Sequence, residues 1–185
     1  MKEQIEIEYK ILITQDIFQQ MINNNQVERD YIQTNYYFTH PILQAKKYML
    51  RIREKDNTYE LTLKRPYLTH QLETNIIIDK QTKDKLISHQ YINNEIIDIL
   101  QKEGINPLEL VQQFSLTTHR YDIQLNEGTL SLDHNQYLGK EDYELEFEVY
   151  HEKEGYEKFL EIISAYQLQY TNNCKSKIKR VLDSL

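Results

Sequence analysis

The feature that most constrains this chain is a strict alternation of apolar and charged residues in two strand-like segments. In "IEIEYKI", residues 5–11, isoleucine and tyrosine alternate with two glutamates and a lysine. In "YELEFEV", residues 143–149, every second residue is a glutamate. Because successive side chains of a β-strand point to opposite faces, both segments are predicted to be strands with one apolar face and one charged face.

The strand-like segments between these two carry the same pattern with basic residues. Arg51 and Arg53 share a face in "LRIRE", and Lys64 shares a face with Glu60 in "YELTLK". Arg120 lies on the charged face of "THRYDI". The terminal strands therefore carry carboxylates, whereas the middle strands carry mainly guanidinium and ammonium groups.

The rest of the pattern predicts about eight strands, mostly antiparallel, with amphipathic helices between them. Apolar spacing and capping residues predict helices within residues 14–25, 82–103, 152–166 and 175–185. We therefore predict an α+β fold with a closed or nearly closed eight-stranded antiparallel β-barrel. If the apolar faces point outward beneath the helices, the charged faces line the lumen of a tunnel.

Length and charge indicate the class of protein and of partner. The 185 residues suit a single domain, residues 1–185, and no linker or repeat divides them. The net charge of −7 argues against binding to nucleic acid or to an anionic membrane. No membrane-spanning or signal segment is found and Cys174 is the only cysteine, so we expect a cytoplasmic protein.

The two kinds of charged wall suit one class of ligand. Clustered glutamates bind hard divalent cations through oxygen. Arginine and lysine bind phosphate oxygens, and arginine can do so in bidentate geometry. The four glycines form no phosphate-binding loop, so a bound phosphate would have to be held by these side chains. A metal-chelated polyphosphate fits both walls.

In order along the chain, these segments resemble the CYTH domain, also called the triphosphate tunnel metalloenzyme superfamily, which includes thiamine triphosphatases and class IV adenylyl cyclases. The segment "EIEYK", residues 6–10, matches the ExExK signature of that family. The resemblance continues through "LRIR", "LTLK", "THRYD", "LSLDH", "YELEFE" and "SKIKR". The five-residue signature is weak alone, whereas the ordered set of seven segments is specific.

The resemblance implies roles for the charged residues and implies Mg²⁺ or Mn²⁺ as the cofactor. The metal ligands would be glutamates from both ends of the chain: Glu6 and Glu8, with either Glu144 and Glu146 or Glu146 and Glu148, of which we favour the first pair. The triphosphate would be bound by six basic residues: Lys10, Arg51, Arg53, Lys64, Arg120 and Lys177. Asp133 would lie near the metal, and the expected catalytic set is Glu6, Glu8, Lys10 and Asp133.

Two positions depart from the family pattern. Thr118 stands where the family usually has a second base, and the charged cluster of the fifth strand is reduced to Glu73-Thr74-Asn75. Both departures are compatible with triphosphate binding, but they leave the identity of the substrate undecided. We expect Glu60 and Asp122 to be structural ion-pair partners rather than ligands.

The resemblance therefore implies a metal-dependent hydrolase of a linear triphosphate, which would release phosphate through attack by a metal-activated water. The substrate would be inorganic triphosphate, thiamine triphosphate or a nucleoside triphosphate. Two alternatives stay open: a class IV-type adenylyl cyclase that makes cyclic AMP from ATP, and a non-catalytic polyphosphate-binding module. The expected partner is a small-molecule triphosphate, and a homodimer is left open.

Overall fold

The computed structural model describes residues 2–184, which form two compact units. Among these residues, unit 1 comprises residues 2–6 and Gln33–Leu116, and unit 2 comprises Ile7–Ile32 and residues 117–184. Strands β3 (Arg29–Thr39) and β7 (Val111–Gln124) each contribute residues to both units. Within residues 2–184, no helix is long and apolar enough to cross a membrane.

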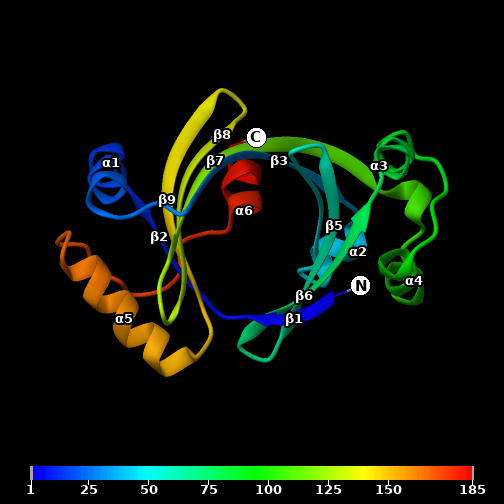
Figure 1. The fold of residues 1–185 in the computed structure, drawn as a ribbon. Helices are drawn as coiled ribbons and strands as arrows, with labels where there is room; N and C mark the ends of the chain where they lie inside the picture. The colour runs from blue at the N-terminus through cyan, green and yellow to red at the C-terminus, as the bar shows by residue number, and fades with distance from the viewer. Residues whose placement is uncertain (1, 185) are drawn as a thin grey trace. The chain divides into compact units, whose positions relative to one another are not determined.

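Unit 1 is an antiparallel sheet with short helices packed on one side. Its strands are hydrogen-bonded in the order β1-β6-β5-β4-β3-β7. The strands not yet introduced are β1 (Lys2–Glu6), β4 (Met49–Lys55), β5 (Thr58–Tyr67) and β6 (His70–Ile78). The helices are α2 (Pro41–Ala45), α3 (Lys80–Ile87), α4 (Glu95–Lys102) and the 3-10 turn η1 (Pro107–Glu109). Helices α3 and α4 lie on the same side of the sheet (Figure 1).

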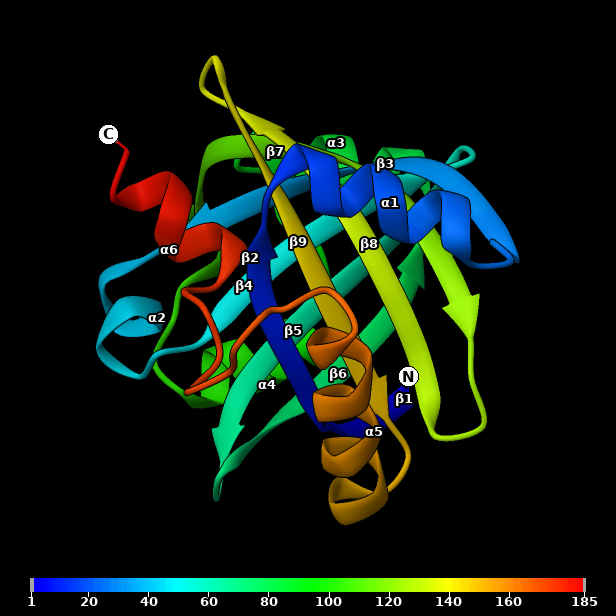
Figure 2. The ribbon, with the colours of Figure 1, turned by 90° about the vertical axis from the view of Figure 1, so that its left-hand side faces the viewer.

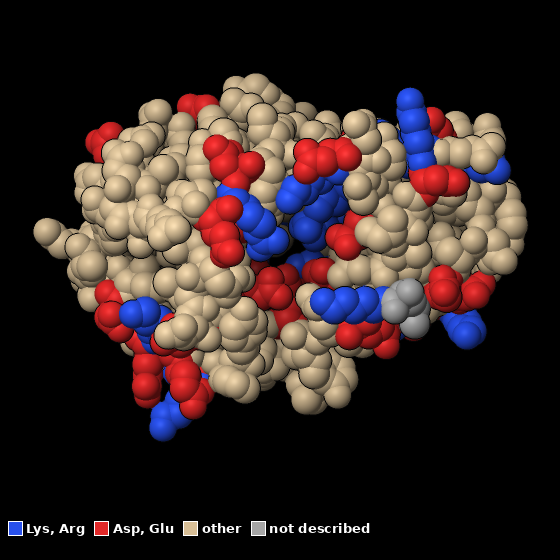
Figure 3. Space-filling model, in the orientation of Figure 1, with Lys and Arg blue, Asp and Glu red and all other residues tan. Residues whose placement is uncertain are grey.

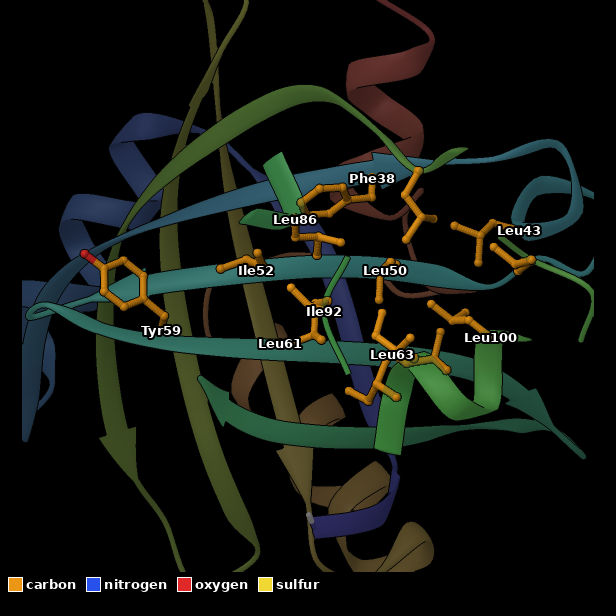
Figure 4. Close-up of a cluster of buried hydrophobic side chains, with 14 residues drawn as sticks. Phe38, Leu43, Leu50, Ile52, Tyr59, Leu61, Leu63, Leu86, Ile92 and Leu100 are labelled. Atoms are coloured by element: carbon orange, nitrogen blue, oxygen red, sulfur yellow. The ribbon is translucent and has the colours of Figure 1, made fainter. Parts of the chain in front are cut away.

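The apolar core of unit 1 lies between this sheet and its helices. Leu50 and Ile52 of β4 and Leu61 and Leu63 of β5 are fully buried. They point toward Leu86, Leu100 and the other labelled core residues (Figure 4). Because the core residues of each strand are two apart, the residues between them lie on the opposite face of the sheet.

Helix α3 is also attached to the sheet by a buried cation. The ammonium of Lys83 donates to Glu54 Oε2 at 2.6 Å. The same ammonium lies 4.6 Å from the ring centroid of Tyr36 and 4.8 Å from that of Tyr59. A desolvated ammonium above aromatic faces is stabilised by the quadrupole of the rings. Lys83 therefore holds α3 against β3, β4 and β5.

Unit 2 is built on the same plan. Its strands are hydrogen-bonded in the order β3-β7-β8-β9-β2. The new elements are β2 (Glu8–Ile13), β8 (Gly128–Tyr137), β9 (Lys140–Val149), α1 (Gln15–Asn24), α5 (Glu152–Ser164) and α6 (Lys177–Leu182). Helices α1 and α5 lie over one face of β2, β8 and β9 (Figure 2). There Leu145 and Phe147 of β9 pack with Met21 of α1 and Phe159 of α5.

Helix α5 approaches β9 most closely at a glycine. A Cβ atom built on Gly155 would lie 2.5 Å from the Cβ of Val149. Carbon atoms that are not bonded to each other do not approach so closely in a packed interior. Gly155 thus allows α5 to pack directly against the apolar face of β9.

The predicted α+β fold, with antiparallel strands and helices packed on their apolar faces, is confirmed. Residues 2–184 contain nine strands, because the first predicted strand is divided at Ile7. Strand β1 pairs antiparallel with β6, whereas β2 pairs antiparallel with β9. Ile5, which the alternation places on the apolar face, is 52% exposed because β1 is the edge strand of the unit 1 sheet.

We expect Leu61→Ala to lower the free energy of unfolding by about 2–5 kcal/mol, because it leaves a cavity in the unit 1 core. Leu68→Ala is the matched control, since Leu68 is 89% exposed. That variant should stay within about 0.5 kcal/mol of the wild type. Urea denaturation followed by circular dichroism measures both, and equal losses of stability in the two variants would contradict the assigned core.

Candidate functional site

The structure divides the predicted site residues between the two units. The unit 1 cluster contains Glu6, Arg51, Arg53 and Lys64, together with Glu73. The unit 2 cluster contains Glu8, Lys10, Arg120, Asp133, Glu144, Glu146, Glu148 and Lys177. The ExExK segment is itself divided, because Glu6 belongs to unit 1 and Glu8 to unit 2.

Strand register brings the unit 1 cluster together. Arg51 of β4 lies opposite Thr62 of β5, which lies opposite Asn75 of β6. Lys64 of β5 lies opposite Glu73 of β6. These residues alternate with the core residues of their strands, so they lie on the face of the sheet that points away from the core.

Lys64 links two carboxylates in unit 1. Its ammonium forms an ion pair with Glu6 and lies 2.9 Å from Glu73 Oε2. Glu73 Oε1 accepts a hydrogen bond from Asn75 Nδ2 at 2.7 Å. Burial alone would raise the pKa of Glu73, but the charges of Lys64 and Arg51 outweigh it and lower this pKa to about 2.

The two arginines of β4 are in different settings. Arg51 is buried, and its Nε has no hydrogen-bond partner. Burial opposes its charge, but the nearby Tyr37 and Glu73 outweigh that effect and raise the pKa of Arg51. Arg53 donates from Nε to Asn35 Oδ1 at 3.4 Å, and its Nη1 lies 3.9 Å from Glu60 Oε1. Glu60 is therefore an ion-pair neighbour of Arg53.

Register also brings the unit 2 cluster together. Arg120 of β7 lies opposite Asp133 of β8, which lies opposite Glu144 of β9. Two residues along β9 on the same face, Glu146 lies opposite Lys10 of β2. Two residues further on this face, Glu148 lies opposite Glu8. The alternation read from the sequence thus places acidic and basic residues side by side on one face.

Arg120 and Asp133 form a bidentate ion pair. Arg120 donates from Nε to Oδ1 and from Nη2 to Oδ2, each at 2.6 Å. It also pairs with Glu146. Burial would raise the pKa of the fully buried Asp133, but Arg120 and Lys177 outweigh it, so this pKa is lowered. Asp133 is therefore held as a carboxylate that orients Arg120.

Helix α6 supplies two further cations to the unit 2 cluster. The ammonium of Lys177 lies 2.6 Å from Glu146 Oε1, 2.8 Å from Asp133 Oδ2 and 3.3 Å from Glu144 Oε2. Arg180 donates to both oxygens of Asp142, at 2.8 and 3.1 Å, and also pairs with Glu144. The sequence interpretation missed Arg180 and Asp142. The available signal was the three-residue spacing from Lys177, which places both cations on one helix face.

Glu144 and Glu146, which share one face of β9, have pKa values shifted in opposite directions. Burial and the charge of Glu146 raise the pKa of Glu144 to about 7, although Lys177 opposes this shift. Glu144 Oε1 is buried without a hydrogen-bond partner. For Glu146, burial also favours the neutral form, but Lys177, Arg120 and Lys10 outweigh it and lower the pKa well below its usual range. Glu148, by contrast, is exposed.

Lys10 lies among glutamates of β2 and β9. It forms an ion pair with Glu8. Burial would lower the pKa of Lys10, but the charges of Glu8, Glu146 and Glu144 outweigh it, so the pKa is raised. Lys10 is therefore a fixed positive charge among carboxylates at neutral pH.

Thr118, which departs from the family pattern, and Asp122, which we expected to be a structural ion-pair partner, both lie in defined polar surroundings. Thr118 is fully buried and donates to Asn135 Oδ1 at 2.7 Å, and Asn135 donates in turn to Asp142 Oδ1 at 3.0 Å. Asp122 accepts hydrogen bonds from Ser131 at 2.7 Å and from Tyr31 at 3.1 Å. Both residues lie in hydrogen-bonded networks within unit 2, and Asp122 also pairs with the exposed Arg29 at 3.2 Å.

The clusters provide the oxygen ligands that a hard divalent cation takes. On the face drawn in Figure 3, Lys and Arg side chains lie directly beside Asp and Glu side chains. Within residues 2–184, no three His, Cys, Asp or Glu side chains are arranged to hold a metal ion as they stand. Asp133, Glu144 and Glu146 are instead turned toward Lys and Arg. Carboxylate oxygens are the donors that Mg²⁺ or Mn²⁺ takes, and here cationic side chains occupy them.

Comparison with known proteins identifies the family. The model of the CYTH domain matches residues 4–181. The chain belongs to the CYTH domain family. YjbK of Bacillus subtilis (strain 168), provisionally named a triphosphatase, is 36% identical over 180 residues, which are 93% of each chain. The resemblance seen in the sequence is therefore confirmed.

Two solved structures are similar to the chain along nearly its whole length. A Bacillus halodurans protein provisionally named an adenylate cyclase has a TM-score of 0.89 and 34% identity, over 97% of this chain and 98% of that one. HpAC1 from Hippeastrum, described as a provisional adenylyl cyclase with dominant triphosphatase activity, has a TM-score of 0.79 and 20% identity. That match covers 99% of this chain and 96% of HpAC1 and shows a shared fold.

The lowered pKa of Glu73 predicts a loss of stability in acid. The folded pKa is about 2 against an ordinary value of 4.5, so the stabilisation is present above pH 4.5 and is lost as pH falls toward 2. By linkage, it amounts to about 3 kcal/mol. Glu73→Gln should be less stable at pH 7 and should lose less stability between pH 6 and pH 3.

Chemical denaturation at each pH measures this difference. Glu157→Gln, at an exposed position of α5, is the matched control and should keep the acid dependence of the wild type. An equally steep acid dependence in Glu73→Gln would contradict the assigned pairing with Lys64 and Arg51.

Proposed function

We propose that this CYTH protein is a metal-dependent hydrolase that releases phosphate from a linear triphosphate. The observation that carries the proposal is the concentration of both guanidinium or ammonium groups and carboxylates on the polar face of each unit. Burying such charges is unfavourable unless each one is compensated. A metal-chelated triphosphate supplies negative oxygens to the cations and a positive ion to the carboxylates.

The basic residues bind the phosphate oxygens in this proposal. In unit 1 these are Arg51, Arg53 and Lys64, and the buried Nε of Arg51 has an N–H that is not used within the protein. In unit 2 they are Lys10, Arg120 and Lys177. Arg120 is held by both oxygens of Asp133, so its position is fixed before a ligand arrives. Fixed cations stabilise the charge that develops on the transferred phosphoryl group without further reorganisation.

Carboxylates of each unit are the candidate metal ligands in this proposal. They are Glu6 in unit 1 and Glu8, Glu144 and Glu146 in unit 2. Glu144 and Glu146 share one set of cationic partners, whereas Glu148 is exposed, and this difference favours the 144 and 146 pair. When bound, Mg²⁺ or Mn²⁺ neutralises phosphate oxygens and lowers the pKa of a coordinated water.

Similarity to named proteins supports hydrolysis and also supports one alternative. YjbK, which is 36% identical, is provisionally named a triphosphatase. The Bacillus halodurans protein, which is 34% identical, is provisionally named an adenylate cyclase. The second candidate function is therefore formation of cyclic AMP from ATP at the same residues.

We expect Glu8→Gln to lower phosphate release from tripolyphosphate by about 100-fold or more, because it removes the charge of a proposed metal ligand. A colorimetric phosphate assay with Mg²⁺ and with Mn²⁺ measures the rate. Glu157→Gln is the control and should keep the wild-type rate, since Glu157 is exposed on α5. An unchanged rate of phosphate release in Glu8→Gln would contradict the proposed role of Glu8 as a metal ligand.

The products formed from ATP distinguish the candidate functions. Hydrolysis should give ADP and phosphate, whereas cyclisation would give cyclic AMP and pyrophosphate. Chromatography of the nucleotides after incubation with each metal measures both outcomes. Thermal stabilisation by triphosphates without turnover of any of them would instead favour a binding module.

A further inference from the structure

The ammonium of Lys177 occupies a position between three carboxylates. Its Nζ contacts Glu146, Asp133 and Glu144 at 2.6, 2.8 and 3.3 Å. Asp133 and Glu144 are fully buried, so these contacts are shielded from water. One oxygen of Glu144 has no hydrogen-bond partner. The ammonium is therefore a counter-ion shared by all three carboxylates, beside Arg120 and Arg180, which also pair with them.

We propose that this ammonium is a replaceable counter-ion and that a divalent cation bound by the same carboxylates displaces Lys177. Binding of the metal and the attachment of helix α6 would then be coupled. The inference rests on the proposed function, because it uses the carboxylates assigned there to the metal. It goes beyond that function, because it gives the C-terminal helix a second, metal-dependent state.

Charge and distance require the exchange. Mg²⁺ binds oxygen at about 2.0–2.1 Å, so the carboxylates would have to close around it more tightly than they do around the ammonium. An ammonium left within a few ångströms of the metal would repel it strongly in a buried setting. The carboxylates can accommodate the metal or Lys177, but not both at these distances.

The rest of α6 has a separate attachment. Arg180 donates to both oxygens of Asp142, and Asp142 is not a partner of Lys177. Val181 on the same helix is fully buried. Release of Lys177 therefore loosens the first turn of α6 and leaves its last turn attached. The released ammonium is then available to phosphate oxygens. A metal–triphosphate complex would therefore give the carboxylates a metal ion in place of Lys177, and would give Lys177 phosphate oxygens in place of the carboxylates.

Binding of Mn²⁺ alone tests the competition. Lys177→Met keeps most of the length of the side chain and removes its charge, so we expect the affinity for Mn²⁺ to rise about tenfold. Lys179→Met is the matched control, because Lys179 lies on the same helix, is exposed and pairs with Asp183. Its affinity for Mn²⁺ should equal that of the wild type. Isothermal titration calorimetry of the full chain measures all three proteins.

Hydrogen exchange of the Lys179 and Arg180 amides, which donate to Ser176 in the first turn of α6, tests the coupling to the helix. In the wild type and in Lys179→Met, Mn²⁺ should speed exchange of these amides. In Lys177→Met, exchange should be fast already and should not respond to Mn²⁺. If Lys177→Met does not fold, as judged by circular dichroism, Lys177→Gln is measured instead.

The outcomes separate this inference from the proposed function. The inference would be overturned if Lys177→Met bound Mn²⁺ no more tightly than the wild type does. It would also be overturned if Mn²⁺ left amide exchange in α6 of the wild type unchanged. Hydrolysis of triphosphate by the wild type together with either result would leave the proposed function standing. Tighter binding of Mn²⁺ by Lys177→Met, together with no turnover of any triphosphate by the wild type, would support the exchange and reject the hydrolase.

Discussion

Compensation of buried carboxylates is the interaction on which the site in unit 2 depends. Asp133 and Glu144 are fully buried, and a buried carboxylate is costly unless it is paired and hydrogen-bonded. Strand β7 supplies one partner, Arg120, and helix α6 supplies Lys177 and Arg180. The first turn of α6 is therefore attached to the acidic face of β8 and β9, while Arg180 with Asp142 and the buried Val181 attach the rest of the helix.

The same alternation that builds the site also builds the core. On β9, Leu145 and Phe147 pack against α1 and α5, while Glu144 and Glu146 lie on the opposite face. A shift of one residue in strand register would place the glutamates in the core and the apolar residues among the cations. The hydrophobic packing therefore fixes the register of the charged face, and the site can keep an arrangement of like charges that would otherwise be unfavourable.

This coupling explains what the sequence could and could not predict. Two-residue alternation is a local signal, so it located the strands and the charged faces that contain Glu8, Lys10 and Arg120. The division of the first strand at Ile7 depends on pairing with two distant strands, β6 and β9, and alternation contains no such information. Arg180 was missed because a basic residue on a short C-terminal helix resembles a solvated one until its partners are known. The common lumen expected from the sequence stays a prediction.

Thr118 shows how a departure from a family pattern can be read physically. A neutral residue at this position of β7 removes a cation that the family pattern would place on the strand. In this chain Thr118 begins a relay of hydrogen bonds through Asn135 to Asp142, and Asp142 holds Arg180 in a bidentate pair. The guanidinium that pairs with Glu144 thus belongs to Arg180 of α6 and not to a residue of β7. Because a helix can move more readily than a central strand, this arrangement makes the charge balance around Glu144 depend on the state of the C-terminal helix.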